Sequence, residues 1–163
     1  MEKPKIKSTL HVLNEADIKA LPGLYPDMTM KILVGNPELG AVIPGERFNA
    51  FLANFKAGVK SELHWHLIEV LYYVMKGRAK ITDINGKVYD VRPGTLVYAR
   101  PGIAGSHEWK IEEDLQLIGI RASLDPEVAF IQFAVDENLT SRIKFEMLQR
   151  WKAVEFRKSL YTK

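Results

Sequence analysis

Between residues 30 and 135, short apolar runs alternate with turns that contain Gly or Pro, and this pattern constrains the fold more than any other feature of the sequence. Short apolar runs at such regular spacing are typical of the strands of a β-sandwich or barrel. The expected strands are Met30–Gly35, Phe48–Phe55, Leu63–His66, Val70–Met75, Arg78–Ile84, Lys87–Val91, Leu96–Ala99, His107–Lys110, Leu115–Ala122 and Ala129–Phe133. The pattern therefore predicts one all-β domain over residues 30–135.

One turn in this domain carries a sharper local signal. Asn85 and Gly86 lie between the expected strands Arg78–Ile84 and Lys87–Val91. Both residue types tolerate a positive φ, which the two central residues of a type I′ turn require. The sequence predicts a β-hairpin with a type I′ turn at this point.

The two flanking segments have a different texture. Residues 1–29 form a polar lead-in with a short helix expected over Asn14–Leu21, before Pro22 and Gly23. In the extension at residues 136–163 an apolar side chain recurs at every fourth position: Leu139, Ile143, Met147 and Trp151. This period predicts an amphipathic C-terminal α-helix. Its apolar stripe is expected to pack on the outside of the β domain, with a dimer interface as the alternative.

The sequence contains few residue types that could bind a metal or act as a nucleophile. The chain has no Cys and four His, which excludes thiolate nucleophiles, zinc ribbons and iron–sulfur clusters. Any metal must therefore be held by His, Asp or Glu. Lys and Arg number 23 against 20 Asp and Glu, and the two signs are mixed along the chain, so no nucleic-acid partner is expected. No apolar stretch is long enough to span a membrane, and we expect a cytoplasmic protein.

Three of the four histidines lie in the predicted β region. His64 and His66 are two positions apart, so a strand would project both imidazoles from one face of its sheet. If His107 lies on a facing strand, a third imidazole completes a cap of three nitrogens on a divalent metal. The alternative is that these are surface or core-edge histidines that alternate by chance. His11, in the polar lead-in, is interpreted as a surface residue.

The residues around these histidines resemble the two motifs of the cupin superfamily. The segment Gly58 to Gly77 has the Gly, His-x-His and Gly pattern of the first cupin motif, and Val91 to His107 is similar to the second. The resemblance implies a double-stranded β-helix, a jelly-roll barrel with one metal inside. It also implies His64, His66 and His107 as metal ligands.

The sequence departs from the cupin motifs at two places. The first motif usually has a Glu ligand at the position that Val70 occupies here. Glu69 is adjacent, but in a regular strand its side chain points to the opposite face, and it would need a bulge to become the fourth ligand. We therefore predict a three-His site and leave a role for Glu69 open. The second motif has one extra residue between Gly94 and Pro101 and another before His107. The motif therefore does not define the strand register there, although it still identifies His107.

A three-His cupin without the Glu resembles the subgroup that includes acetylacetone-cleaving and 2,4′-dihydroxyacetophenone dioxygenases. The resemblance implies Fe(II) as the metal, with Zn, Mn or Ni as alternatives. It also implies cleavage of a C–C bond in a small aromatic or β-dicarbonyl compound, because a neutral ligand set leaves the metal its full charge for an anionic enolate. A homodimer is the expected assembly.

Other side chains are candidates for the pocket around the metal. Tyr72 is expected to point inward with Val70, and Trp109 to share a face with His107. Both are interpreted as barrel core, with a role in the wall of a substrate pocket as the alternative. Arg100 and Arg121 are interpreted as solvated strand ends, with binding of an acidic substrate as the alternative.

Two other functions remain open at this stage. One is a non-catalytic cupin that binds a metal or a small ligand, as a sensor or storage module. The other is a metal-independent cupin isomerase or epimerase, in which His64 would transfer a proton. The same fold carries all of these functions, so the fold does not choose among them.

Overall fold

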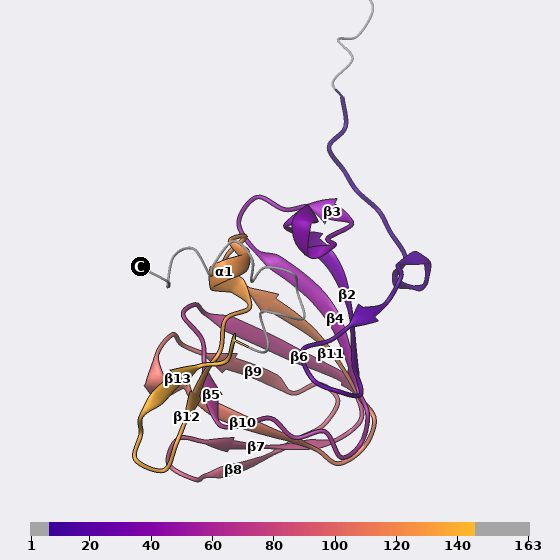
Figure 1. Cartoon of the computed structure of the whole chain (residues 1–163). Helices are drawn as coiled ribbons and strands as arrows, with labels where there is room; N and C mark the ends of the chain where they lie inside the picture. Colours follow the sequence, from indigo (N-terminus) through magenta and orange to yellow (C-terminus); the bar gives the residue numbers. More distant parts are fainter. Residues whose placement is uncertain (1–6, 146–163) are drawn as a thin grey trace, which may run out of the picture.

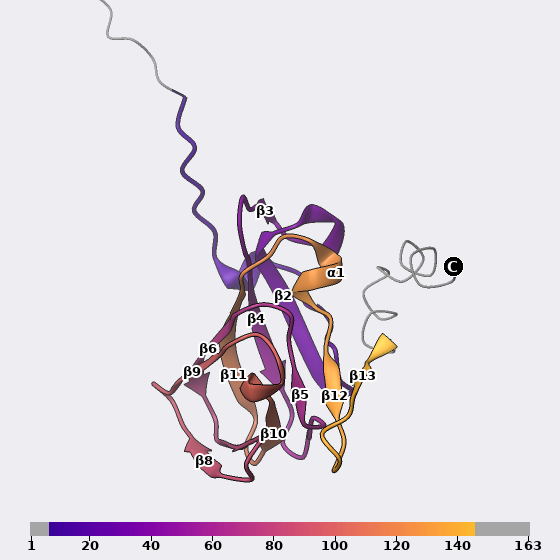
Figure 2. The ribbon, with the colours of Figure 1, turned by 90° about the vertical axis from the view of Figure 1, so that its left-hand side faces the viewer.

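The computed structural model of the chain describes residues 7–145, apart from the side chains of residues 126 and 127. Its core is a barrel made from two facing sheets (Figures 1 and 2). The first sheet contains β1 (Leu21–Pro22), β2 (Met28–Gly35), β3 (Ile43–Pro44), β4 (Asn49–Phe55), β6 (Val70–Lys76), β9 (Leu96–Ala99) and β11 (Leu115–Arg121). The second contains β5 (His64–Trp65), β7 (Ala79–Asp83), β8 (Val88–Val91), β10 (His107–Ile111), β12 (Phe133–Val135) and β13 (Ser141–Ile143).

The strand order shows how the two sheets are connected. The first sheet has the order β1-β2-β4-β11-β6-β9, and β3 pairs with β2 in parallel. The second sheet has the order β13-β12-β5-β10-β7-β8, and all its pairings are antiparallel. The chain passes repeatedly from one sheet to the other, as in a jelly roll. The all-β jelly-roll prediction is confirmed.

Alternation of burial along the strands places the core between the sheets. On β6 the side chains of Val70, Tyr72 and Val74 are buried and their neighbours are more exposed. On β10 the same alternation buries His107 and Trp109. Because successive side chains of a strand point to opposite faces, one face of each sheet fills the barrel and the other faces outward.

The predicted hairpin forms between β7 and β8, but its turn is not type I′. The only described non-Gly residues with positive φ are Asp27 and Leu139, so Asn85 lacks the conformation that type I′ requires. Instead the Gly86 amide donates to the Asp83 carbonyl at 3.0 Å, and Gly86 alone has a left-handed φ of 78°. The Asp83 carboxylate accepts from the amides of Asn85 and Lys87, which stabilises this longer loop.

The predicted C-terminal helix is wrong where the structure describes it. Residues 141–143 form β13, which pairs with β12, and the Asp136 side chain accepts from the amides of Asn138 and Thr140 in the turn between the two strands. Strand pairing and this turn outweigh the helical preference of a sequence with an apolar residue at every fourth position. Met147 and Trp151 lie outside the described residues. The expected strand Ala129–Phe133 is displaced as well, because the short helix α1 (Pro126–Ala129) precedes β12.

The lead-in segment is less helical than expected. Its only helix among the described residues is the 3₁₀ turn η1 (Glu15–Asp17), which the Asn14 side chain caps. Leu24 and Met28, at the end of the lead-in, are buried in the barrel core. Two further 3₁₀ turns, η2 (Pro37–Leu39) and η3 (Ile103–Gly105), connect strands. No helix within residues 7–145 has the length and apolarity of a membrane span.

Gly77, at the end of β6, provides a test of the barrel packing. Its φ is +85°, and a Cβ at this position would lie 2.1 Å from the carbonyl oxygen of Asp114. Gly58 has a similar φ of +91° but nothing within 4 Å of its Cβ position. We expect Gly77→Ala to lower the free energy of unfolding by about 3 kcal/mol or more, and Gly58→Ala by about 1 kcal/mol, in urea denaturation. Equal losses would contradict a tight contact between Gly77 and Asp114.

Candidate metal centre

Strand pairing brings together the three histidines that the sequence singled out. In the antiparallel pair of β5 and β10, His107 lies directly opposite His64. His66 directly follows β5 and lies two residues after His64, so it points to the same side as His64. The three side chains are buried between the sheets, with 2%, 2% and 4% exposure for His64, His66 and His107.

The three imidazoles form a compact cluster. Each offers one ring nitrogen, and these three nitrogens all lie within 4.8 Å of one another. The ring centroids are 4.7 Å apart for His64 and His107, 5.0 Å for His64 and His66, and 5.5 Å for His66 and His107. Nitrogens this close to one another could hold a single ion between them.

Hydrogen bonds determine which nitrogen of each ring is available to a metal. His64 Nδ1 lies 2.7 Å from the Glu62 carbonyl oxygen, and His107 Nδ1 lies 3.0 Å from that of Gly105. Since a carbonyl only accepts, both Nδ1 atoms carry the proton and both Nε2 atoms keep a lone pair. Within residues 7–145, the Nε2 atoms of His66 and His107 are buried without a hydrogen-bond partner. An orphaned, unprotonated nitrogen such as Nε2 of His107 fits a divalent metal.

His66 has a different environment from the other two. Its Nδ1 lies 3.2 Å from Nη1 of Arg121, and its ring also hydrogen-bonds to the backbone at Ile131. The bond to the Ile131 backbone raises the pKa of His66, as expected when the ring donates its proton. Because a guanidinium only donates, Nε2 of His66 is available to a metal only in the tautomer that has its proton on Nδ1 and does not accept from Arg121.

The buried environment keeps all three rings neutral. Burial lowers the pKa of His107 to about 4. The pKa values of His64 and His66 are held well below the usual value, mainly by burial, with further lowering by His107 for His64 and by the positive charge of Arg121 for His66. Neutral imidazoles are the form that binds metals, so protons compete weakly with a metal at neutral pH.

Glu69 lies away from this cluster. Its side chain is exposed and its carboxylate accepts a hydrogen bond from the Tyr98 hydroxyl on the outer face of the first sheet. Val70 points inward instead and is buried. Among residues 7–145, the cluster of metal-binding side chains contains the three histidines and no carboxylate. The regular strand geometry thus keeps Glu69 on the opposite face, as the alternation predicted.

Comparisons with known proteins agree with this architecture. Residues 51–120 match the family described as Cupin domain. The barrel has the cupin fold. No curated protein matches the sequence significantly.

Solved cupin structures superimpose on the chain at low sequence identity. A protein of unknown function with a cupin-like fold from Ralstonia eutropha has a TM-score of 0.62 and 15% identity, covering 96% of this chain and 90% of its own. The polyketide cyclase RemF from Streptomyces resistomycificus has a TM-score of 0.59 and 17% identity, covering 70% and 80%. Ectoine synthase from P. lautus has a TM-score of 0.55 and 17% identity, covering 70% and 78%. At these identities the likeness concerns the fold alone.

The cupin barrel encloses a small cavity next to the histidines. The cavity has a volume of about 40 Å³ and is lined by His64 and by apolar and aromatic side chains from both sheets. Tyr72 and Trp109 both line it and pack edge-to-face, with ring centroids 5.5 Å apart. Tyr72 also packs edge-to-face on His107. The expected inward direction of Tyr72 and Trp109 is therefore what the barrel shows.

Sequence reasoning misplaced one residue of this interior and missed two others. Arg121 is not a solvated strand end, because its side chain is 2% exposed and lines the cavity. Arg100 is exposed, as expected. Tyr25 and Gln132 also line the cavity, and the Tyr25 hydroxyl donates to Gln132 Oε1 at 3.0 Å. Neither belongs to a sequence motif, so no local signal pointed to them.

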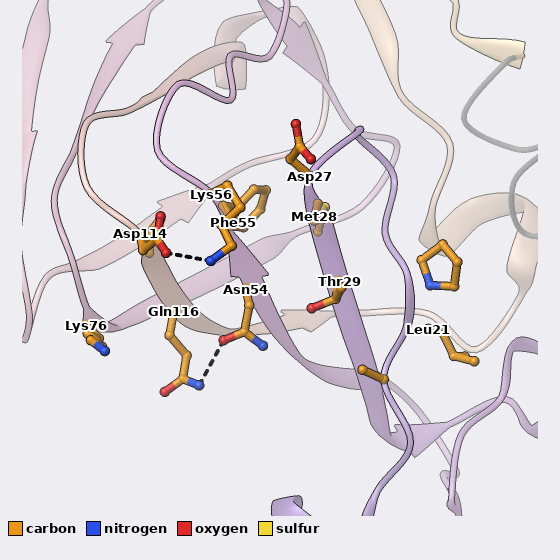
Figure 3. A pocket seen from close by; sticks show the side chains of 13 residues that line it. Leu21, Asp27, Met28, Thr29, Asn54, Phe55, Lys56, Lys76, Asp114 and Gln116 are labelled. Carbon is orange, nitrogen blue, oxygen red and sulfur yellow. Dashed lines mark hydrogen bonds and ion pairs between the residues drawn. The ribbon is translucent and has the colours of Figure 1, made fainter.

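Two open depressions lie on the outer surface. One, of about 570 Å³, is lined by residues of β7, β8 and β9 and also by His107, so it borders the cluster. The other, of about 800 Å³, lies between β2, β4 and β11 and contains none of the three histidines (Figure 3). Its polar side chains are paired with one another, Lys56 with Asp114 at 2.8 Å and Gln116 with Asn54 at 3.0 Å. The first depression is therefore the better approach for a ligand.

The neutral histidines predict how the stability of the metal-free protein depends on pH. His107 has a folded-state pKa of about 4 and an unfolded value near 6.5, so between these pH values only the unfolded state binds the proton. Stability is therefore lost as the pH falls through this window, by about 3 kcal/mol for His107. Urea denaturation in the presence of a chelator, at pH 7 and pH 5, should detect about 2 kcal/mol of this loss, because pH 5 lies inside the window. His107→Gln should show a smaller loss than the wild-type protein, and an equal loss would contradict the assignment.

Proposed function

We propose that this cupin is an enzyme that uses one divalent metal ion, held by His64, His66 and His107, to transform a small molecule. The observation that carries the proposal is the set of buried neutral imidazoles whose nitrogens converge, two of them orphaned at Nε2. A buried polar atom without a partner is costly, and a metal ion removes that cost by accepting the lone pair. Fe(II) is the proposed metal, with Zn, Mn or Ni as alternatives.

The protein residues hold and shield this site. The carbonyls of Glu62 and Gly105 fix the orientation of His64 and His107 through their Nδ1 protons. Tyr72 and Trp109 form an apolar wall that excludes water from the interior. A metal ion in this setting supplies Lewis acidity to a chelating substrate and, as iron, electron transfer with dioxygen.

Metal analysis of the native protein tests the first part of the proposal. We expect one metal ion per chain and a loss of metal affinity of more than about 100-fold in His64→Ala and His66→Ala, because even substitutions behind the ligands cost about 10–100-fold. Elemental analysis and competition with a chromophoric chelator give stoichiometry and affinity. His11→Ala is the matched control, because His11 is exposed in the lead-in. Unchanged metal binding in His64→Ala would overturn the site.

For the reaction, we propose cleavage of a C–C bond in a small aromatic or β-dicarbonyl compound by dioxygen. A β-diketone and one O₂ would yield a 1,2-dicarbonyl compound and a carboxylic acid, with both oxygen atoms incorporated in the products. Support comes from the neutral ligand set, which leaves the metal its full charge for an enolate. The cupin fold also serves a polyketide cyclase and an ectoine synthase, so the reaction must be tested separately from the metal.

Oxygen uptake tests the reaction. We expect the Fe(II)-loaded protein to consume one O₂ for each molecule of 2,4-pentanedione or of an aromatic hydroxyketone and to release a carboxylic acid. An oxygen electrode and product chromatography measure both. Zn-loaded protein is the control and should consume no O₂. Tight iron binding without O₂ uptake would refute the dioxygenase and leave a metal-binding cupin of another function. The expected homodimer stays a prediction.

A further inference from the structure

Arg121, at the end of β11, is a buried cation without a matching anion. Among residues 7–145, no carboxylate forms an ion pair with it, although the side chain is 2% exposed. Its guanidinium lies over the rings of Phe51 and Phe130, at 5.5 and 4.9 Å from their centroids. Removing an unpaired charge from water costs several kcal/mol. Ring stacking, the Ala129 carbonyl and the contacts with Tyr72 and His66 are all to neutral groups and offset only part of that cost, so the position favours an anion.

The donors of Arg121 are not all used by the protein. Nη1 donates to the Ala129 carbonyl at 2.9 Å, and Nη2 donates to the Tyr72 hydroxyl at 3.4 Å. Nε is buried and has no hydrogen-bond partner in the part of the chain that the structure describes. Because the Tyr72 oxygen accepts from Nη2, its own proton is left for another acceptor. The pair therefore keeps the Arg121 Nε–H and the Tyr72 O–H for a ligand that accepts hydrogen bonds.

These donors belong to the cavity beside the histidines. Arg121, Tyr72 and His64 line the same enclosed space of about 40 Å³. A volume of this size holds roughly three water-sized groups. The three heavy atoms of a carboxylate match it, while the rest of a larger molecule would have to lie outside.

The charge inside the cavity is positive. The positive charge of Arg121 lowers the pKa of each of the three histidines and also that of Tyr25 and Tyr72. Burial is the larger influence on both tyrosines and raises their pKa, so they stay protonated at neutral pH. With neutral histidines and neutral tyrosines, the guanidinium charge is uncompensated within the cavity. A negative ligand group would be attracted there and a positive one excluded.

We propose that this cavity is an oxyanion site, in which Arg121 and Tyr72 bind the carboxylate or enolate oxygens of a small organic anion. The anion site itself does not depend on a metal. Its identification as the place where the substrate's charged group binds rests on the function proposed above. It narrows the substrate class to small monoanions, with the reacting carbons positioned next to the three histidines.

Acetate binding to the metal-free protein tests the oxyanion site. We expect acetate to bind saturably in calorimetry at constant ionic strength and to raise the melting temperature of chelator-treated protein. Acetamide, which has the same shape without the charge, should do neither. Arg121→Met should weaken acetate binding at least about tenfold, since a hydrogen bond to a charged group contributes about 1.5–3 kcal/mol. Tyr72→Phe should weaken it to a smaller extent.

Two further variants keep the test decisive. Arg100→Met removes an exposed arginine and should leave acetate binding unchanged. Arg121→Lys retains the positive charge but lacks the planar guanidinium with its several N–H donors, so it should bind acetate more weakly than the wild-type protein. It serves as the main variant if Arg121→Met does not fold.

Specific results would overturn the oxyanion site. They are the absence of saturable acetate binding in the wild-type protein, equal binding of acetamide, or wild-type acetate affinity in a folded Arg121 variant. Each would leave Arg121 as a structural clamp between β11 and α1. These outcomes are independent of the metal assay, because the histidine variants report on the metal and the acetate titration uses protein without it.

Discussion

The antiparallel pairing of β5 with β10 places His64 opposite His107, and the chemistry of the barrel interior depends on that register. A shift of one residue would turn every side chain of the strand to the other face. His107 would then face outward, and Trp109 would leave the cavity wall. The same strand β10 pairs with β7 over its full length, which anchors the register through ordinary sheet hydrogen bonds. The position of the histidine cluster is therefore fixed by the backbone hydrogen bonds of whole strands and not by contacts among the three side chains.

Burial inside the barrel produces the electrostatic character of the interior. Three imidazoles that would titrate near neutral pH in water remain neutral between the sheets. Arg121 stays charged in the same environment, because an arginine side chain does not give up its proton in proteins. Within residues 7–145, the interior therefore combines three neutral imidazoles that could hold a metal ion with one positive charge that no carboxylate pairs. A metal ion would add to that positive charge, which makes an anionic partner still more favourable.

Features that depend on neighbouring residues could be predicted from the sequence, and features that depend on distant residues could not. Strand Leu96–Ala99 was placed at its observed ends, and the inward direction of Tyr72 followed from alternation with Val70. The type I′ turn was wrong because the Asp83 side chain, outside the two-residue motif, stabilises a longer loop. The C-terminal helix was wrong over 141–143 because pairing with β12 outweighed a helical period.

The sequence by itself determined most strands of the central barrel and the three histidines, because side-chain alternation and motif spacing are properties of neighbouring residues. It also excluded every thiolate ligand through the absence of cysteine. Only the tertiary structure decided what surrounds the histidines. Arg121 looks like a solvated strand end in the sequence, and its burial beside Tyr72 and His66 arises from strands and loops far apart along the chain. Burial and pairing of a charge depend on the three-dimensional neighbourhood, which no local pattern encodes.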